Sequence, residues 1–83
     1  GLKFDAVVLD PPRKGCDEAV LRAAAQTNPA RIVYVSCNPA TLARDVARLR
    51  KLGYVLRKAR PFDMFSWTGE VETVALLERE KLD

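Results

Sequence analysis

The 83-residue sequence contains no histidine and only two cysteines. Without histidine, the chain cannot itself supply a Ser-His-Asp triad or a Cys-His nucleophile pair. Two cysteines are too few for a disulfide framework, and their spacing fits no zinc pattern, so no metal site is predicted. No apolar run approaches the roughly 18 residues that a membrane helix needs, and the first residues do not resemble a signal peptide. We therefore expect a protein of the reducing cytoplasm with no membrane partner.

The residues that are present describe a small globular chain. Apolar residues make up 48% and charged residues 30% of the sequence, and the length allows one small domain. A first strand that begins near residue 4, with nothing before it, suggests a piece of a larger protein. The net charge is only +3, but residues 44–60 hold seven basic residues against Asp45. Such a cluster attracts phosphate backbones, or it is simply a solvated helix face with charged strand flanks.

Hydrophobic periodicity predicts the element order β-α-β-α-β-β. The expected strands cover residues 4–9, 31–36, 54–60 and 71–79. Asp17 and Asn38 are expected to cap the two helices, which end before Pro29 and Gly53. Pro39 suits the first position of the second helix. The apolar faces expected on these helices consist of Val20, Leu21 and Ala24 in the first, and Leu42, Val46, Leu49 and Leu52 in the second.

The connections between these elements limit the topology. The first three strands are joined by helices and should be parallel neighbours, whereas the last two are joined by a loop and should pair antiparallel or lie close. This pattern indicates an α/β fold that forms the second half of a doubly wound sheet, without its nucleotide-binding first half. Half a sheet leaves one strand edge and one apolar face uncovered. We therefore expect the isolated chain to form a homodimer, exchange strands or be poorly soluble.

Two reactive side chains follow the first two strands. Asp10 ends the first strand, before two prolines, and Cys37 ends the second. Ligands bind at the carboxyl ends of strands in open α/β sheets, and the two side chains would be one or two strand spacings of ~4.8 Å apart. Asp10 can accept a hydrogen bond from a ring N–H or an amino group, and a helix N-terminus favours a thiolate at Cys37. The structural alternatives are a strand-end cap for Asp10 and a small buried apolar residue for Cys37.

Further candidates lie elsewhere in the chain. Glu72, near the start of the last strand, either faces solvent or enters the site as a general base, which must reach the proton that it removes. Glu70 would share its strand face. Cys16, in a loop, is interpreted as incidental. The segment 61–69 is rich in aromatic residues, which either stack on unpaired RNA bases or cover the domain's own core.

Three stretches carry a family resemblance: LDPPRKG (9–15), YVSCNPATLARD (34–45), and PFDMF (61–65) followed by VETVALL (71–77). Together they resemble the catalytic domain of the RNA uracil-5-methyltransferases, which use S-adenosylmethionine to make 5-methyluridine in tRNA and in 23S ribosomal RNA. The stretches occur in the family's order and cover nearly the whole chain. The middle stretch is highly specific, whereas an Asp-Pro-Pro motif alone is common among methyltransferases.

The resemblance implies the C-terminal half of a Rossmann-like class I methyltransferase fold with its last strand antiparallel. Residues 1–83 would form a partial catalytic domain whose cofactor-binding half is absent. The family implies Cys37 as the nucleophile that adds to carbon 6 of a flipped uracil, and Glu72 as the base that removes the carbon-5 proton. It implies that Asp10 contacts the uracil edge and, at the boundary of the site, the cofactor.

The resemblance also implies S-adenosylmethionine as cofactor and an rRNA or tRNA uridine as substrate. Because the main cofactor motif lies outside the chain, the chain alone is predicted to be inactive. Two positions depart from the family pattern: Ser66 stands where proline is usual, and Glu70 where histidine is usual. The alternative is a non-catalytic RNA-binding or regulatory module with a degenerate methyltransferase fold, which the basic residues and the aromatic segment would serve equally well.

Overall fold

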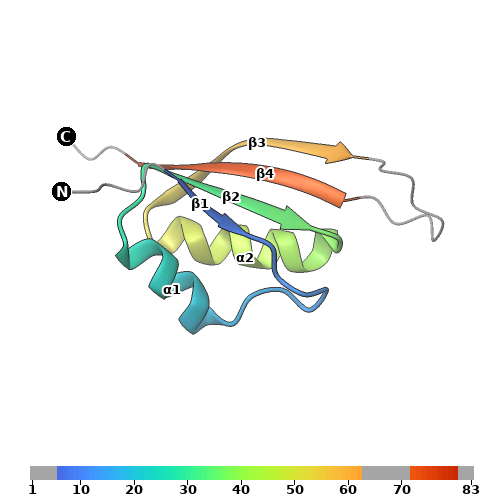
Figure 1. Ribbon diagram of the computed structural model, residues 1–83, viewed down its shortest axis with the longest axis horizontal. Coiled ribbons are helices and arrows are strands. Elements are labelled where there is room, and N and C mark those ends of the chain that lie inside the picture. Colours follow the sequence, from blue (N-terminus) through green and yellow to red (C-terminus); the bar gives the residue numbers. More distant parts are fainter. Residues whose placement is uncertain (1–5, 63–71, 81–83) are drawn as a thin grey trace.

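A computed structural model describes residues 6–62 and 72–80 of the chain (Figure 1). The expected element order is confirmed. The elements are β1 (Ala6–Leu9), α1 (Glu18–Gln26), β2 (Arg31–Ser36), α2 (Pro39–Lys51), β3 (Tyr54–Phe62) and β4 (Glu72–Arg79). β3 continues two residues past its expected end at Arg60. The expected start of the first strand at Phe4, the segment 63–71 with Ser66 and Glu70, and the last three residues of the tail lie outside the described residues.

The four strands form one sheet in the order β1-β2-β4-β3. β1 and β2 are parallel neighbours and β3 and β4 are antiparallel, as expected. The expectation that β2 and β3 are also neighbours is wrong, because β4 lies between them and pairs antiparallel with both. The strand compositions explain this order. β4 has an apolar centre over residues 74–77 and suits an interior position, whereas β3 carries the charges that are typical of an edge strand.

Both helices cover the same face of the sheet (Figure 1). Residues alternate along a strand, so every second side chain of β2 and β4 points into the layer between sheet and helices. The fully buried side chains of that layer include Ile32, Tyr34, Ala75 and Leu77 from the sheet and Leu21 and Leu49 from the helices. The apolar residues between them on β2 and β4 point to the helix-free face.

The helix ends follow from their sequences. Asn38 caps α2, accepting a hydrogen bond from the Ala40 amide on its side-chain oxygen at 3.0 Å. At the other end Gly53, with φ +96°, takes the left-handed conformation that ends many helices. Asp17 occupies the predicted cap position of α1, but its side chain makes no capping hydrogen bond. Val20 is 46% exposed rather than part of the buried face of α1, which consists of Leu21 and Ala24.

Candidate active site

The three predicted site residues follow or begin three adjacent strands. β1 pairs with β2 so that Leu9 lies opposite Tyr34, and Asp10 therefore leaves β1 beside the last residues of β2. On the other side of β2, Ser36 pairs with Thr73. Glu72 begins β4 immediately before that pair, and Cys37 follows β2 immediately after it. One strand spacing of ~4.8 Å separates neighbouring strands, so the topology brings all three residues to one end of the sheet.

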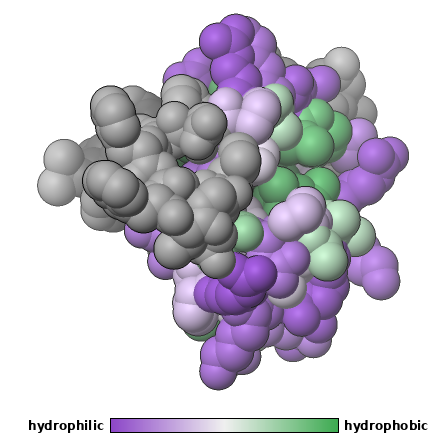
Figure 2. All heavy atoms as spheres, turned by 90° about the vertical axis from the view of Figure 1, so that its right-hand side faces the viewer, coloured by the Kyte–Doolittle hydropathy of each residue, from purple (hydrophilic) through white to green (hydrophobic). Residues whose placement is uncertain are grey.

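This end of the sheet is accessible from outside the chain. Asp10 and Glu72 are exposed, and the free thiol of Cys37 is half-buried. Figure 2 looks at the molecule from this end and shows hydrophobic surface between hydrophilic side chains. A thiol between two carboxylate-bearing strand ends can act as a nucleophile with an acid or base within reach.

Two hydrogen bonds join the residues on either side of Cys37. The Asn38 amide donates to the Ser36 hydroxyl oxygen at 3.0 Å, and that hydroxyl donates to the Asn38 carbonyl at 2.9 Å. These bonds close a tight turn between β2 and α2, with Cys37 at its apex. The side-chain amide of Asn38 reaches the Arg13 carbonyl at 3.4 Å. The turn that carries Cys37 is therefore tied directly to the loop that follows Asp10.

That loop folds closely against α2. The Gly15 amide donates to the Pro12 carbonyl at 2.8 Å and closes a turn directly after Asp10 and Pro11. Gly15 has φ +87°, and a Cβ at this position would lie 2.8 Å from the Asp45 Oδ2 atom and 3.2 Å from the Thr41 Cβ atom. Glycine is required here for both reasons, since the backbone is left-handed and there is no room for a side chain.

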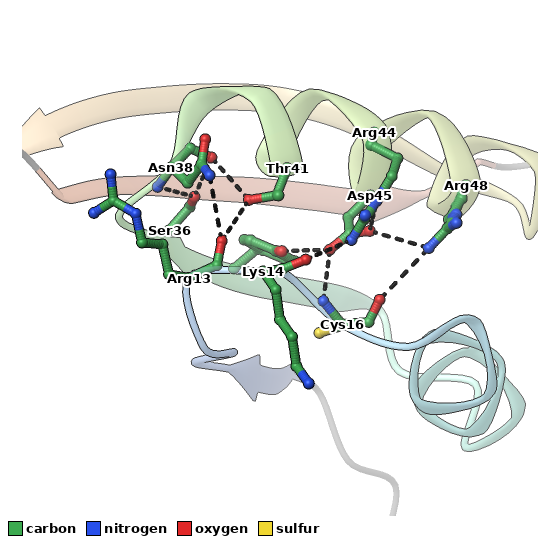
Figure 3. A network of polar contacts seen from close by, with 10 residues as sticks. Arg13, Lys14, Cys16, Ser36, Asn38, Thr41, Arg44, Asp45 and Arg48 are labelled. Atoms are coloured by element: carbon green, nitrogen blue, oxygen red, sulfur yellow. Dashed lines mark hydrogen bonds and ion pairs between the residues drawn. The ribbon is translucent and has the colours of Figure 1, made fainter.

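The side chains of α2 hold the carbonyls and one amide of the same loop (Figure 3). Asp45 Oδ2 accepts from the Cys16 amide at 2.9 Å and from the Tyr34 hydroxyl at 2.5 Å. Asp45 Oδ1 accepts from Arg44 Nε at 3.2 Å and lies 3.6 Å from Arg48 Nη1. The remaining ties from α2 are Thr41 Oγ1 to the Arg13 carbonyl (3.2 Å), Arg44 Nη2 to the Lys14 carbonyl (2.8 Å) and Arg48 Nη1 to the Cys16 carbonyl (3.5 Å).

The cluster around Asp45 was not predicted from the sequence, although the sequence carries a signal for it. Asp45 is three residues after Leu42 and four before Leu49, so it lies on the apolar stripe of α2 rather than on its basic face. The structure buries it completely. A buried carboxylate needs hydrogen-bond partners, and the main chain of the loop supplies one of them.

The pKa values of the neutral groups beside Asp45 are raised. Burial raises the pKa of the Tyr34 hydroxyl above its ordinary value, and its hydrogen bond to Asp45 acts in the same direction. Burial also raises the pKa of the Cys16 thiol, followed by repulsion from Asp45. The Cys16 side chain is 7% exposed and packs in the core. Cys16 therefore stays a protonated core thiol at neutral pH, which agrees with its interpretation as incidental to chemistry.

A hollow of about 310 Å³ lies beside the outer edge of β1. It is lined by Asp10, Lys14 and Asp17 together with apolar side chains that include Val8 and Val20. Val8 is 66% exposed, and β1 has no second neighbour among the described strands.

Within residues 6–62 and 72–80, no group of three or more potential ligand side chains is arranged to hold a metal ion. No helix in that part of the chain is long and apolar enough to cross a membrane.

Comparison with known sequences identifies the family. A family model described as tRNA (uracil-5-)-methyltransferase matches residues 1–80. The chain belongs to this family. Similar curated proteins, all described as uncharacterized RNA methyltransferases, come from Gloeobacter violaceus (59% identity over 78 residues), Clostridium tetani (57% over 77) and Halalkalibacterium halodurans (55% over 78). The matches cover 93–94% of this chain and 17% of each relative.

Solved structures of other proteins share the fold. The Pyrococcus abyssi tRNA (uracil-54, C5)-methyltransferase, in complex with S-adenosyl-L-homocysteine, superposes with a TM-score of 0.75 at 44% identity. The match covers 89% of this chain and 18% of that protein. The M1.HpyAVI–SAM complex is 19% identical, with a TM-score of 0.71 over 99% of this chain and 46% of that one. The expected class I methyltransferase fold, with its last strand antiparallel, is thus confirmed.

Proposed function

We propose that the protein containing this chain methylates carbon 5 of a uridine in rRNA or tRNA. The observation that carries this proposal is the meeting of Asp10, Cys37 and Glu72 at one end of three adjacent strands. Membership of the tRNA (uracil-5-)-methyltransferase family supports it. The chain spans about a sixth of the length of its relatives, so the activity belongs to the longer protein, and we predict that residues 1–83 alone have none.

The proposed reaction assigns one step to each residue. The target uracil leaves its stack to reach the site. The Cys37 thiolate forms a bond to carbon 6, and the electrons of the 5,6 double bond make carbon 5 nucleophilic. When bound, S-adenosylmethionine would supply the methyl group that carbon 5 takes up, and S-adenosylhomocysteine would leave as the bond between methyl carbon and sulfur breaks. The Glu72 carboxylate then removes the carbon-5 proton, the double bond re-forms, and the carbon 6–sulfur bond breaks to release Cys37.

Asp10 is proposed to accept a hydrogen bond from the uracil edge. It leaves β1 at the unpaired edge of the described sheet, beside the hollow of about 310 Å³. In doubly wound sheets a cofactor binds at the carboxyl ends of the strands, near the point where strand order reverses. A carboxylate there also suits an amino group of S-adenosylmethionine, so Asp10 would stand at the boundary between uracil and cofactor.

The surroundings of the site fit a larger protein of the cytoplasm. The free thiol of Cys37 must stay reduced for the reaction, as it does in that compartment. In the longer protein other segments would cover the edge of β1 that no described strand pairs with, and the face of the sheet opposite α1 and α2. In the isolated chain we propose that a second copy covers them, through dimerisation or strand exchange.

The experiment that tests the function is covalent trapping in the full-length protein. RNA with 5-fluorouracil at the target position should form a stable adduct in the presence of S-adenosylmethionine, because fluorine cannot be removed as a proton. Cys37→Ala should form no adduct and transfer no methyl group to ordinary RNA, whereas Cys16→Ser should still form the adduct. A Cys37→Ala protein that methylates uridine at the normal rate would contradict the covalent mechanism assigned to Cys37. A full-length wild-type protein that binds the RNA but neither methylates it nor forms the adduct would leave RNA binding alone as the role.

A further inference from the structure

Asp45 is a buried charge whose contacts extend beyond the core. Its side chain is completely buried in the middle of α2. One carboxylate oxygen accepts hydrogen bonds from the Tyr34 hydroxyl and the Cys16 amide. The other forms ion pairs with the guanidinium groups of Arg44 and Arg48. Removing a partner from such a cluster leaves a buried polar group unsatisfied. The cluster is therefore a rigid joint between β2, α2 and the loop that precedes α1.

The part of the loop held by this joint is close in sequence to Asp10. All four residues from Arg13 to Cys16 contact α2. Side chains of the helix form hydrogen bonds with three carbonyls and one amide of this stretch, and Gly15 packs so closely that a Cβ would not fit. Two prolines lie between this stretch and Asp10, and the hydrogen bond from the Gly15 amide to the Pro12 carbonyl joins the second proline to the stretch. Proline fixes its backbone φ angle, so the position of the clamped stretch sets the position of Asp10.

The same helix sets the position of the nucleophile. α2 begins directly after Cys37 and Asn38, and Asp45 lies eight residues after Cys37. From Pro39, the first residue of α2, to Asp45 the helix rises about 9 Å at 1.5 Å per residue. α2 is thus one rigid body that follows Cys37 directly after the cap residue Asn38 and holds the loop after Asp10 at its middle. Any shift of the loop on the helix changes the distance between Asp10 and Cys37.

We propose that Asp45 is a positioning residue for the methyl-transfer reaction. It acts through the Cys16 amide and the loop main chain, and it fixes Asp10 relative to Cys37. This inference rests on the proposed function, since it assumes that Asp10 and Cys37 contact the same uracil. Misplacing a binding group by about 1 Å from a distant mutation can cost ~100-fold in rate, so the effect on turnover should exceed the effect on RNA binding.

The test is a double-mutant cycle in the full-length protein. Asp45→Asn keeps the shape but replaces one acceptor oxygen by an NH₂ group, which then faces a donor. We expect kcat to fall about 10- to 100-fold with the KM for RNA nearly unchanged. In an Asp10→Ala background the same substitution should cause little further loss, because Asp10 is the group that it displaces. A merely structural role of Asp45 would give additive losses, which would overturn the proposal.

Two further variants keep the test decisive if Asp45→Asn folds poorly. Arg44→Ala removes the tie to the Lys14 carbonyl from a side chain that is 43% exposed, so it should fold and lower kcat in the same non-additive way with Asp10→Ala. Arg22→Ala, which breaks only an exposed pair with Glu18 on α1, should leave kcat unchanged. If folded Arg44→Ala keeps the wild-type kcat, the clamp is not what positions Asp10.

A second readout does not depend on the chemistry. Arg13 and Lys14 are exposed and are cleavage sites for trypsin, and the clamp restrains the backbone on which trypsin acts. Asp45→Asn should speed cleavage at Arg13 and Lys14 in the native protein, and unchanged cleavage would overturn the clamp. A full-length protein that methylates no uridine would instead defeat the proposed function without changing the trypsin result, so the two failures are distinguishable.

Discussion

Tyr34 of β2 donates its hydroxyl to the buried carboxylate of Asp45 in α2 at 2.5 Å. Both side chains are completely buried, so this bond joins the sheet to the helix in the centre of the core. Hydrogen bonds to charged groups contribute more than neutral ones, about 1.5–3 kcal/mol. Tyr34 therefore stabilises the core through this hydrogen bond as well as through the burial of its ring.

The first prediction concerns Tyr34→Phe. The change leaves the Asp45 carboxylate without one of its partners and should lower the free energy of unfolding by about 1.5–3 kcal/mol. The matched control is Tyr54→Phe, whose buried hydroxyl donates to the Pro29 carbonyl at 2.6 Å and should cost only about 1 kcal/mol. Melting temperatures of the full-length variants measure both. Equal losses would show that the charge of Asp45 adds nothing to the bond.

The second prediction is a loss of stability at alkaline pH. The pKa values of Tyr34 and Cys16 are raised in the folded state from ordinary values of 10.0 and 9.0, so folding favours their protonated forms. Their contribution is complete below the unfolded pKa values and is lost as pH rises through the folded ones. Stability should fall above about pH 9, by up to ~1.4 kcal/mol per pH unit and group. Urea midpoints between neutral pH and about pH 10.5 measure this, and Tyr34→Phe should flatten the upper part of the curve.

The third prediction compares two glycines with positive φ angles. Gly15→Ala places a Cβ against Asp45 and Thr41, whereas Gly53→Ala meets nothing within 4 Å. Both changes carry the backbone strain of a left-handed alanine, about 1–2 kcal/mol, but only the first also displaces the loop from α2. Thermal unfolding should show a larger loss for Gly15→Ala, and methyl transfer should fall only in that variant. A Gly15→Ala protein as stable as Gly53→Ala would contradict the close packing.

Most of the fold could be predicted from the sequence because its signals are local. The Asn38-Pro39 start and the Gly53 stop define α2, and the apolar runs define the strands. The strand order could not be predicted from connection lengths, which indicate whether strands are parallel but not which edge the last one joins. The composition held the missing signal, because the charged β3 suits an edge and the apolar centre of β4 suits the interior.

Part of the candidate site could also be predicted, because local sequence signals mark the ends of the strands. Asp10, Cys37 and Glu72 are marked by their positions at strand ends, and the register places them together. In a count of charges, Asp45 is only the one acidic residue within a basic stretch. Its place on the apolar stripe of α2 becomes visible only when the helical spacing of the residues is considered. Two of its partners, Tyr34 and Cys16, lie 11 and 29 residues away in sequence, and no local pattern reveals contacts of that kind.

The last prediction tests the role of Glu72. Glu72→Gln keeps the size of the side chain but removes the base that would take the carbon-5 proton. Addition of Cys37 and methyl transfer do not require that base, so the variant should transfer about one methyl group per protein and then stall as a methylated covalent adduct. Multiple turnover should fall by ~10²- to 10⁴-fold, the usual contribution of a general base.

Quench-flow counting of methyl groups and denaturing gels of the protein–RNA adduct measure this outcome. The matched control is Glu78→Gln on the same strand, whose residue pairs with Arg31 at the opposite end of β2 from Cys37 and should turn over normally. Glu72 begins β4 beside the Ser36–Thr73 pair, and the proposed mechanism requires its carboxylate to reach a uracil bonded to Cys37. Normal multiple turnover by Glu72→Gln would assign the proton to another group, while an inactive variant that forms no adduct would place Glu72 in substrate binding instead.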